Sequence, residues 1–161
     1  MASTIVACAV RFDRATFAHV GDSRGYLVRN GKAKVLTSDH TVVNEQVRMG
    51  ILSKEEAESA ETRHVLTRSL GNNLFVKVDI SEIQVQPGDV LLTCSDGLHG
   101  AISGAEIART ISQGSDLNAI AAQLVASANR EDGGDNVSLQ LIAVRNVERT
   151  GMYRGRPYTL R

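Results

Sequence analysis

The 161-residue sequence contains only two cysteines, two prolines, no tryptophan and 4% aromatic residues. Two cysteines are too few for a disulfide scaffold, and Cys8 and Cys94 each lie within an apolar run. They are therefore expected to be reduced core thiols. No apolar run approaches the ~18 residues of a transmembrane helix. The first residues, Met1 to Thr4, carry no basic segment and do not resemble a signal peptide. These absences predict a cytoplasmic chain without a membrane segment.

The sequence also lacks a net charge, because eighteen Lys and Arg residues balance eighteen Asp and Glu residues. A dedicated nucleic-acid-binding domain is usually strongly basic, so we expect no nucleic-acid partner. Apolar residues make up 42% of the chain and charged residues 22%, which is the composition of an ordinary globular domain. Only the end of the chain departs from this balance. Five arginines fall after Val144, at positions 145, 149, 154, 156 and 161, and we interpret residues 148–161 as a basic tail or linker.

Strand-like segments dominate the first part of the sequence. Residues 3–10 and 15–20 are short β-rich runs, and residues 24–29 and 32–36 flank Asn30-Gly31. Asn-Gly between two such runs predicts a tight hairpin, because both turn residues tolerate positive φ. Three later runs predict further strands, at residues 76–85, 90–95 and 136–144.

Helical patterns occupy two other regions. Residues 41–50 and 53–60 predict two short helices within a polar insertion, and the second opens with a Ser53–Glu56 capping box. A second capping-box pattern, Ser103–Glu106, begins a helix that reaches residue 111. Residues 116–130 carry apolar side chains at the spacing of an amphipathic helix. Because strands and helices show little βαβ alternation, the sequence predicts an α+β fold.

Three strands end in turns that join an aspartate to a glycine. These turns contain Asp22, Asp96 and Asp135. Gly-Asp and Asp-Gly are ordinary turn dipeptides when each is taken alone. Hard cations such as Mg²⁺ and Mn²⁺, however, prefer carboxylate oxygens, and aspartates on converging strand ends would provide them. The spacing by itself does not show that the three turns converge.

Other kinds of site find little support. The four histidines, at positions 19, 40, 64 and 99, lack the paired spacing of a zinc site, so we interpret them as structural or surface residues. The acidic loop at residues 131–136 lacks the alternation and the terminal glutamate of an EF-hand. No phosphate-binding glycine loop and no arrangement around a nucleophilic serine is present.

Five segments, in order, resemble signatures of the metal-dependent serine/threonine protein phosphatases, the PPM or type 2C family. They are AHVGDSRGYL at 18–27, LTSDHT at 36–41, LTRSLG at 66–71, GDVLLTCSDGL at 88–98 and DNVS at 135–138. The resemblance covers residues 1–147. It implies a four-layer α-β-β-α sandwich of two antiparallel sheets flanked by helices, with residues 41–71 forming a flap-like insertion on the substrate side.

The resemblance also implies an activity, the hydrolysis of phosphoserine and phosphothreonine in protein substrates at a two-metal centre that holds Mn²⁺ or Mg²⁺. By motif position, Asp96 and Asp135 correspond to metal ligands of the catalytic pair, and Asp22 corresponds to a ligand of a third metal in bacterial members. No protein nucleophile is needed, because metal-bound water attacks the phosphorus directly.

The resemblance further leads us to expect an incomplete domain. The family's first acidic ligand, its DGxxGH-type segment and its phosphate-binding arginine lie upstream of the strand that Met1 begins. The chain is then roughly the C-terminal two thirds of the domain and, alone, weakly active or inactive. The alternative is a pseudophosphatase or interaction module without catalysis. Sheets that lack neighbouring strands expose their edges, so self-association is also expected.

Overall fold

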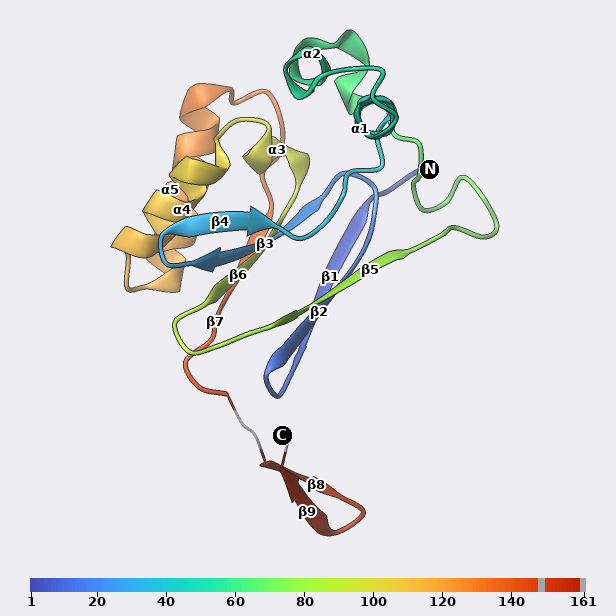
Figure 1. The fold of residues 1–161 in the computed structure, drawn as a ribbon. Coiled ribbons are helices and arrows are strands. Elements are labelled where there is room, and N and C mark those ends of the chain that lie inside the picture. The colour runs from blue at the N-terminus through green and yellow to red at the C-terminus, as the bar shows by residue number, and fades with distance from the viewer. Residues whose placement is uncertain (148–149, 160–161) are drawn as a thin grey trace.

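Two antiparallel sheets form the centre of the computed structural model, which describes residues 1–147 and 150–159 (Figure 1). The first sheet has the order β1-β2-β5 and contains β1 (Ile5–Arg11), β2 (Arg14–Val20) and β5 (Asp79–Gln84). The second has the order β4-β3-β6-β7 and contains β3 (Arg24–Arg29), β4 (Lys32–Val35), β6 (Val90–Cys94) and β7 (Leu139–Ala143). All the pairings are antiparallel, which confirms the predicted α+β class.

The predicted Asn30-Gly31 hairpin joins β3 to β4. Asn30 has φ of 51° and Gly31 has φ of 73°, so both central residues adopt the left-handed conformation that a type I′ turn requires. Arg29 consequently pairs with Lys32 across the turn. This register fixes which side chains of β3 face the core.

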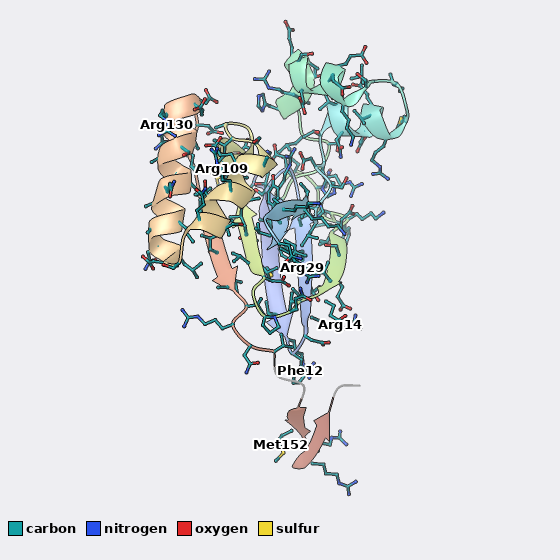
Figure 2. All side chains as sticks on the ribbon, turned by 60° about the vertical axis from the view of Figure 1, so that its left-hand side comes forward. Phe12, Arg14, Arg29, Arg109, Arg130 and Met152 are labelled. Carbon is teal, nitrogen blue, oxygen red and sulfur yellow. The ribbon has the colours of Figure 1, made fainter. Side chains whose placement is uncertain are left out.

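Helices cover the outer face of the second sheet. They are α3 (Asp96–His99), α4 (Gly104–Gln113) and α5 (Leu117–Glu131). Contacts link α4 to β4 and α5 to β7, and Figure 2 shows α4 and α5, marked by Arg109 and Arg130, beside the sheets. In the described part of the chain, no helix covers the outer face of β1-β2-β5 (Figure 1). Three of the four layers of the predicted sandwich are thus formed here.

The core has two parts, one on each face of the second sheet. Between this sheet and the helices lie buried side chains that include Leu92, Leu98 and Leu124. Between the two sheets lie Phe17, Leu91 and others. The apolar face predicted for α5 is confirmed, because Ile120, Leu124 and Ala128 are buried. No helix within residues 1–147 and 150–159 is long and apolar enough to cross a membrane.

The polar insertion at residues 41–71 folds into three short helical pieces at one end of the sheets. They are α1 (Val42–Arg48), α2 (Lys54–Ser59) and the 3₁₀ helix η1 (Glu61–His64). The predicted capping box at Ser53 and Glu56 is confirmed with both of its hydrogen bonds. At α4, by contrast, Ser103 accepts a bond from the Glu106 amide, but the reciprocal bond is not formed. The side chain of Glu106 lies instead 3.7 Å from Arg109.

A small hairpin follows the second sheet. It consists of β8 (Thr150–Tyr153) and β9 (Arg156–Thr159), within the segment that the sequence indicated only as a basic tail or linker. The pattern gave no strand signal there, and the hairpin is closed by Arg154 and Gly155, both with positive φ. Arg149 and Arg161 of the predicted tail lie outside the described residues.

Candidate metal centre

The first aspartate turn lies between β2 and β3. Asp22 is only 9% exposed although it lies in a turn. Gly21 precedes it with φ of 105°, and a Cβ there would lie 2.4 Å from Cγ2 of Thr4. Only glycine fits this position, because the turn needs both a left-handed backbone and a close approach to the segment before β1. The turn is therefore fixed by packing.

Hydrogen bonds directly join the second turn, which contains Asp96, to the third, which contains Asp135. The amide of Ser95 donates to the carbonyl of Ser138 at 2.9 Å, and the hydroxyl of Ser95 accepts from the amide of Ser138 at 3.0 Å. A Cβ on Gly97 would lie 2.5 Å from the carbonyl oxygen of Asn136. The segment that carries Asp96 therefore lies against the segment that carries Asp135.

A hydrogen bond joins the first turn to the second. Nε2 of His99, in the helix that Asp96 begins, lies 2.9 Å from the carbonyl oxygen of Asp22. Because β3, β6 and β7 are neighbours in one sheet, the turns that contain Asp22, Asp96 and Asp135 meet at one end of it. The structure thus supplies the convergence that the spacing alone did not show.

Asp22, Asp96 and Asp135 have no basic partner among the described residues, whereas the three aspartates nearest to arginines are paired. Asp39, Asp79 and Asp89 each form an ion pair with an arginine. Asp22, Asp96 and Asp135 form no ion pair within the described residues. Burial raises the pKa of Asp22 above its ordinary value, and the nearby charge of Asp96 raises it further. Two carboxylates that repel one another and have no positive partner favour the binding of a cation.

The donor set fits a hard divalent metal. All three candidate ligands offer carboxylate oxygens, the ligands that Mg²⁺ and Mn²⁺ prefer. Asp135 is exposed and Asp96 is half-buried, so water has access to complete the coordination of a bound ion.

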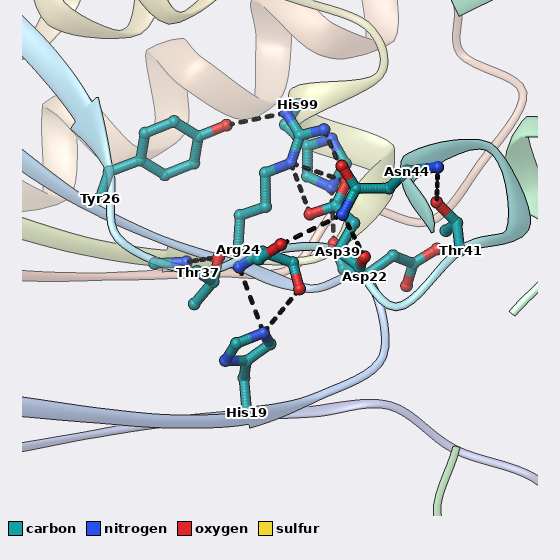
Figure 3. Close-up of polar contacts among 11 residues, drawn as sticks. His19, Asp22, Arg24, Tyr26, Thr37, Asp39, Thr41, Asn44 and His99 are labelled. Carbon is teal, nitrogen blue, oxygen red and sulfur yellow. Dashed lines mark hydrogen bonds and ion pairs between the residues drawn. The ribbon is translucent and has the colours of Figure 1, made fainter. Parts of the chain in front are cut away.

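Arg24, two residues after Asp22, connects this end of the sheet to the polar insertion (Figure 3). Its guanidinium donates to both carboxylate oxygens of Asp39, with Nη2 2.7 Å from Oδ2. Burial alone would lower the pKa of Arg24, but the hydrogen bonds and charge of Asp39 raise it. Asn44 of α1 donates in turn to the carbonyl of Asp39. The insertion is therefore fastened beside the Asp22 turn.

The insertion also lies close to the Asp22 turn. His64, at the end of η1, is near enough to Asp22 to lower the pKa of that carboxyl, although this effect is smaller than those of burial and of Asp96. A molecule bound at the aspartates would therefore lie beside the insertion.

Sequence reasoning missed a second group of potential ligands. His19, His40 and Asp79 place one donor atom each within 4.8 Å of one another. The two imidazole rings are buried and stacked, with centroids 4.8 Å apart. The three residues are far apart in the sequence and show no ligand spacing, so no local signal pointed to them.

The negative charge of this second group is already paired with an arginine. Nη1 of Arg68 lies 2.9 Å from Oδ1 of Asp79. The Gly21 amide donates to Nδ1 of His40, so the hydrogen of the neutral ring is on Nε2, which lies 3.3 Å from Oδ2 of Asp79 and 3.1 Å from Nη1 of Arg68. To bind a metal, Nε2 would have to give up this hydrogen and its contact with Asp79. Burial lowers the pKa of His40, which favours this neutral tautomer. We therefore assign the cluster a structural role, which agrees with the prediction for His19 and His40.

Comparisons with known proteins agree with this geometry. Residues 1–137 match the family described as Protein phosphatase 2C. The chain is 37% identical over 156 residues to a serine/threonine phosphatase, stp, from Listeria innocua. It also superimposes on the structure of a serine/threonine phosphatase from S. agalactiae, with a TM-score of 0.84 and 40% sequence identity. The superposition covers 87% of this chain and 58% of that one.

A second similar structure contains metal ions. The catalytic domain of the serine/threonine protein phosphatase PstP, in complex with two manganese ions, is 32% identical with a TM-score of 0.76, over 88% of this chain and 57% of that one. The match to the Listeria relative covers 97% of this chain but 60% of the relative. The chain thus spans about 60% of the length of the curated relatives that it matches.

Proposed function

The chain belongs to the protein phosphatase 2C family, and we propose from this that it contributes the site of a metal-dependent phosphatase that hydrolyses phosphoserine and phosphothreonine in proteins. The observation that carries the proposal is the meeting of three aspartates, without basic partners, at one end of one sheet. Asp39, Asp79 and Asp89 are paired with arginine, whereas Asp22, Asp96 and Asp135 form no ion pair among the described residues and can hold a cation.

The residues have distinct roles in this proposal. Asp96 and Asp135 hold the catalytic pair of Mn²⁺ or Mg²⁺ ions, and Asp22 holds a third. Bound metals of this kind lower the pKa of a coordinated water and neutralise phosphoryl oxygens. The chain's own residues fix the carboxylates, through the Ser95–Ser138 bonds and the glycines that allow close approach. The insertion at residues 41–71 contacts the phosphoprotein.

We further propose that the 161-residue chain alone is weakly active or inactive. Two divalent ions bring four positive charges, and because Asp22 is assigned to the third ion, only two carboxylates of the chain are left to hold them. Asp96 and Asp135 therefore hold two metals with too little negative charge, and we expect the second to bind weakly. Because in-line attack needs both metals, turnover falls with the occupancy of the weaker site.

The test is hydrolysis of a phosphothreonine peptide with Mn²⁺, using the Listeria innocua phosphatase as the reference. We expect the chain to be at least about 100-fold slower, a barrier difference of about 2.7 kcal/mol. Residual turnover should disappear in Asp96→Asn. Turnover at the rate of the reference, lost in the same variant, would overturn the claim of weak activity. Mn²⁺ binding with no turnover at all would favour the alternative, an interaction module built on the phosphatase scaffold.

We also propose that the chain self-associates through the edges of its sheets. The strands β1 and β7 are edge strands, and a cavity of about 270 Å³ between them is lined by residues that include Val6, Cys8 and Ile142. The accessible surface of 10441 Å² exceeds the ~7,800 Å² typical of a folded monomer of this mass. Edge strands with apolar neighbours are ready sites for pairing with another chain.

Sedimentation velocity checks this prediction. The fraction of wild-type chain that sediments as a dimer should increase with protein concentration in the micromolar range. Ile142→Lys, on the β7 edge, should shift it toward monomer, whereas Val35→Lys, on the opposite edge of the same sheet, should leave the association unchanged. A wild-type chain that stays monomeric at all concentrations would contradict it.

We place this activity in the cytoplasm, with phosphoproteins rather than nucleic acids as partners. Cys8 and Cys94 are both free thiols, and burial raises the pKa of Cys94 to about 12, so this thiol stays protonated and unreactive. Free thiols fit a reducing compartment. The zero net charge supports a protein rather than a nucleic-acid partner.

A further inference from the structure

His99 connects two of the candidate ligands from within one short helix. Asp96 begins α3 and His99 ends it, one turn later. Nε2 of His99 lies 2.9 Å from the carbonyl oxygen of Asp22, and the side chain of His99 is half-buried between the Asp22 turn and Arg24 (Figure 3). The hydrogen bond therefore spans directly from the helix of Asp96 to the backbone of Asp22.

The contact fixes the chemistry of the ring. A carbonyl oxygen only accepts, so Nε2 of His99 carries the hydrogen and donates it. Burial lowers the pKa of His99, and the charge of Arg24 lowers it further, so both favour the neutral ring. A neutral ring adds no positive charge that would compete with a bound cation. His99 thus acts through its hydrogen bond and not through charge.

The hydrogen bond from His99 opposes an electrostatic repulsion between Asp22 and Asp96. The turns of Asp22 and Asp96 meet at one end of the sheet, so their carboxylates repel one another when both are ionised. On its other side the turn is held by Gly21, whose amide donates to Nδ1 of His40 and whose carbonyl accepts from the His40 amide. The Asp22 turn therefore lies between two histidines, and the hydrogen bond from His99 joins it to the helix that carries the opposing carboxylate.

We propose that His99 is a positioning residue that holds Asp22 at a fixed distance from Asp96 and thereby raises the affinity of the site for a divalent cation. The inference rests on the proposed function, because it takes both aspartates as metal ligands. Carboxylates already held together bind a cation without the free-energy cost of bringing like charges together. Partners of metal ligands commonly change metal affinity by about 10–100-fold.

The test measures Mn²⁺ affinity directly, by the loss of the free-ion electron paramagnetic resonance signal on titration of the 161-residue chain. His99→Leu should weaken binding by about 10–100-fold. His99→Gln places an amide N–H near the position of Nε2 and should stay within about threefold of wild type, less than 1 kcal/mol. His99→Asn is too short to reach the Asp22 carbonyl and should behave like His99→Leu, which gives a second variant if the leucine substitution does not fold.

A second readout separates positioning from folding. The melting temperature of each variant is measured in EDTA and again with saturating Mn²⁺. The metal-dependent rise should be largely lost in His99→Leu and retained in His99→Gln. Equal Mn²⁺ affinity in wild type and His99→Leu, with binding still lost in Asp22→Asn, would overturn the role of His99 and leave the proposed function standing. Mn²⁺ binding that is unchanged in Asp22→Asn and Asp96→Asn would overturn both.

Discussion

Replacing Asp22 by asparagine is expected to weaken Mn²⁺ binding by about 100-fold, because the site loses one of its few anionic ligands. The same substitution should raise the melting temperature of the metal-free chain by about 2–4 °C, the change that ~1 kcal/mol produces in a domain of this size. The two effects have opposite signs because the carboxylate is nearly buried and repelled by Asp96 when no cation is present. A metal ligand held in this way destabilises the folded chain when the metal is absent.

The stabilisation depends on pH in a defined direction. The folded-state pKa of Asp22 is raised above 3.8, so the folded chain holds this proton more tightly than the unfolded chain does. Stability contributed by the group is present below pH 3.8 and falls as the pH rises through the raised pKa. The advantage of Asp22→Asn should therefore be absent in acid and reach its full size near neutral pH.

Thermal unfolding in EDTA and Mn²⁺ titration measure the two effects. Asp13→Asn is the matched control, since Asp13 lies in the β1–β2 turn, bonded to Gln84, at the other end of the sheet. It should leave Mn²⁺ affinity unchanged. An Asp22→Asn chain that is less stable than wild type in EDTA and binds Mn²⁺ normally would show that Asp22 is a structural residue.

The second large effect is expected at Arg29. This side chain holds Asp89, which is 1% exposed, through two bonds, Nε to Oδ1 at 2.7 Å and Nη2 to Oδ2 at 2.6 Å. Arg29→Met leaves a buried carboxylate without its cation and should lower the free energy of unfolding by about 3–5 kcal/mol. The double variant Arg29→Met/Asp89→Leu removes both charges and should recover most of the loss.

Arg14 supplies the matched control for Arg29, because it also pairs with a carboxylate at 2.6 Å. The Arg14 and Glu82 side chains are 61% and 49% exposed, so Arg14→Met should change stability by less than ~1 kcal/mol. Urea unfolding compares the variants, and Figure 2 shows where both arginines lie. Equal losses for Arg14→Met and Arg29→Met would mean that burial of Asp89 does not determine the effect.

The pH dependence of this pair has the opposite sign to that of Asp22. Burial alone would raise the pKa of Asp89, but the hydrogen bonds from Arg29 and from the Gln86 amide lower it below 3.8. The pair therefore stabilises the fold above the unfolded pKa, and this contribution is lost as the pH falls through the lowered folded value. The difference between wild type and Arg29→Met should shrink in acid.

Local rules predicted most of the regular structure from the sequence. Asn30-Gly31 predicted its hairpin because few residues besides Asn and Gly accept two successive positive φ values. Ser53 and Glu56 predicted the start of α2 because their side chains cap each other's backbone. The helix α3 was missed, since four residues are too few to show a helical period, and β8 and β9 carry no apolar alternation.

The candidate site likewise has a part that the sequence predicted and a part that it did not. Each aspartate was identified from the sequence because it lies at the edge of an apolar strand and adjoins a glycine. Their meeting depends on the strand order β3-β6-β7, which brings together turns that are more than 100 residues apart. The Arg68–Asp79–His40 cluster and the bond from His99 to Asp22 also arise from tertiary packing. No pattern within a single segment contains these contacts.

The central claim is that Asp22, Asp96 and Asp135 form a cation site. Anomalous scattering at the manganese edge, from crystals of the chain grown with Mn²⁺, tests it most directly because the signal locates the metal itself. We predict a peak at the carboxylates of these three turns and none at His19, His40 and Asp79. A peak at the histidine cluster, or no peak beside Asp22, Asp96 and Asp135 when Mn²⁺ is present in excess, would contradict the account.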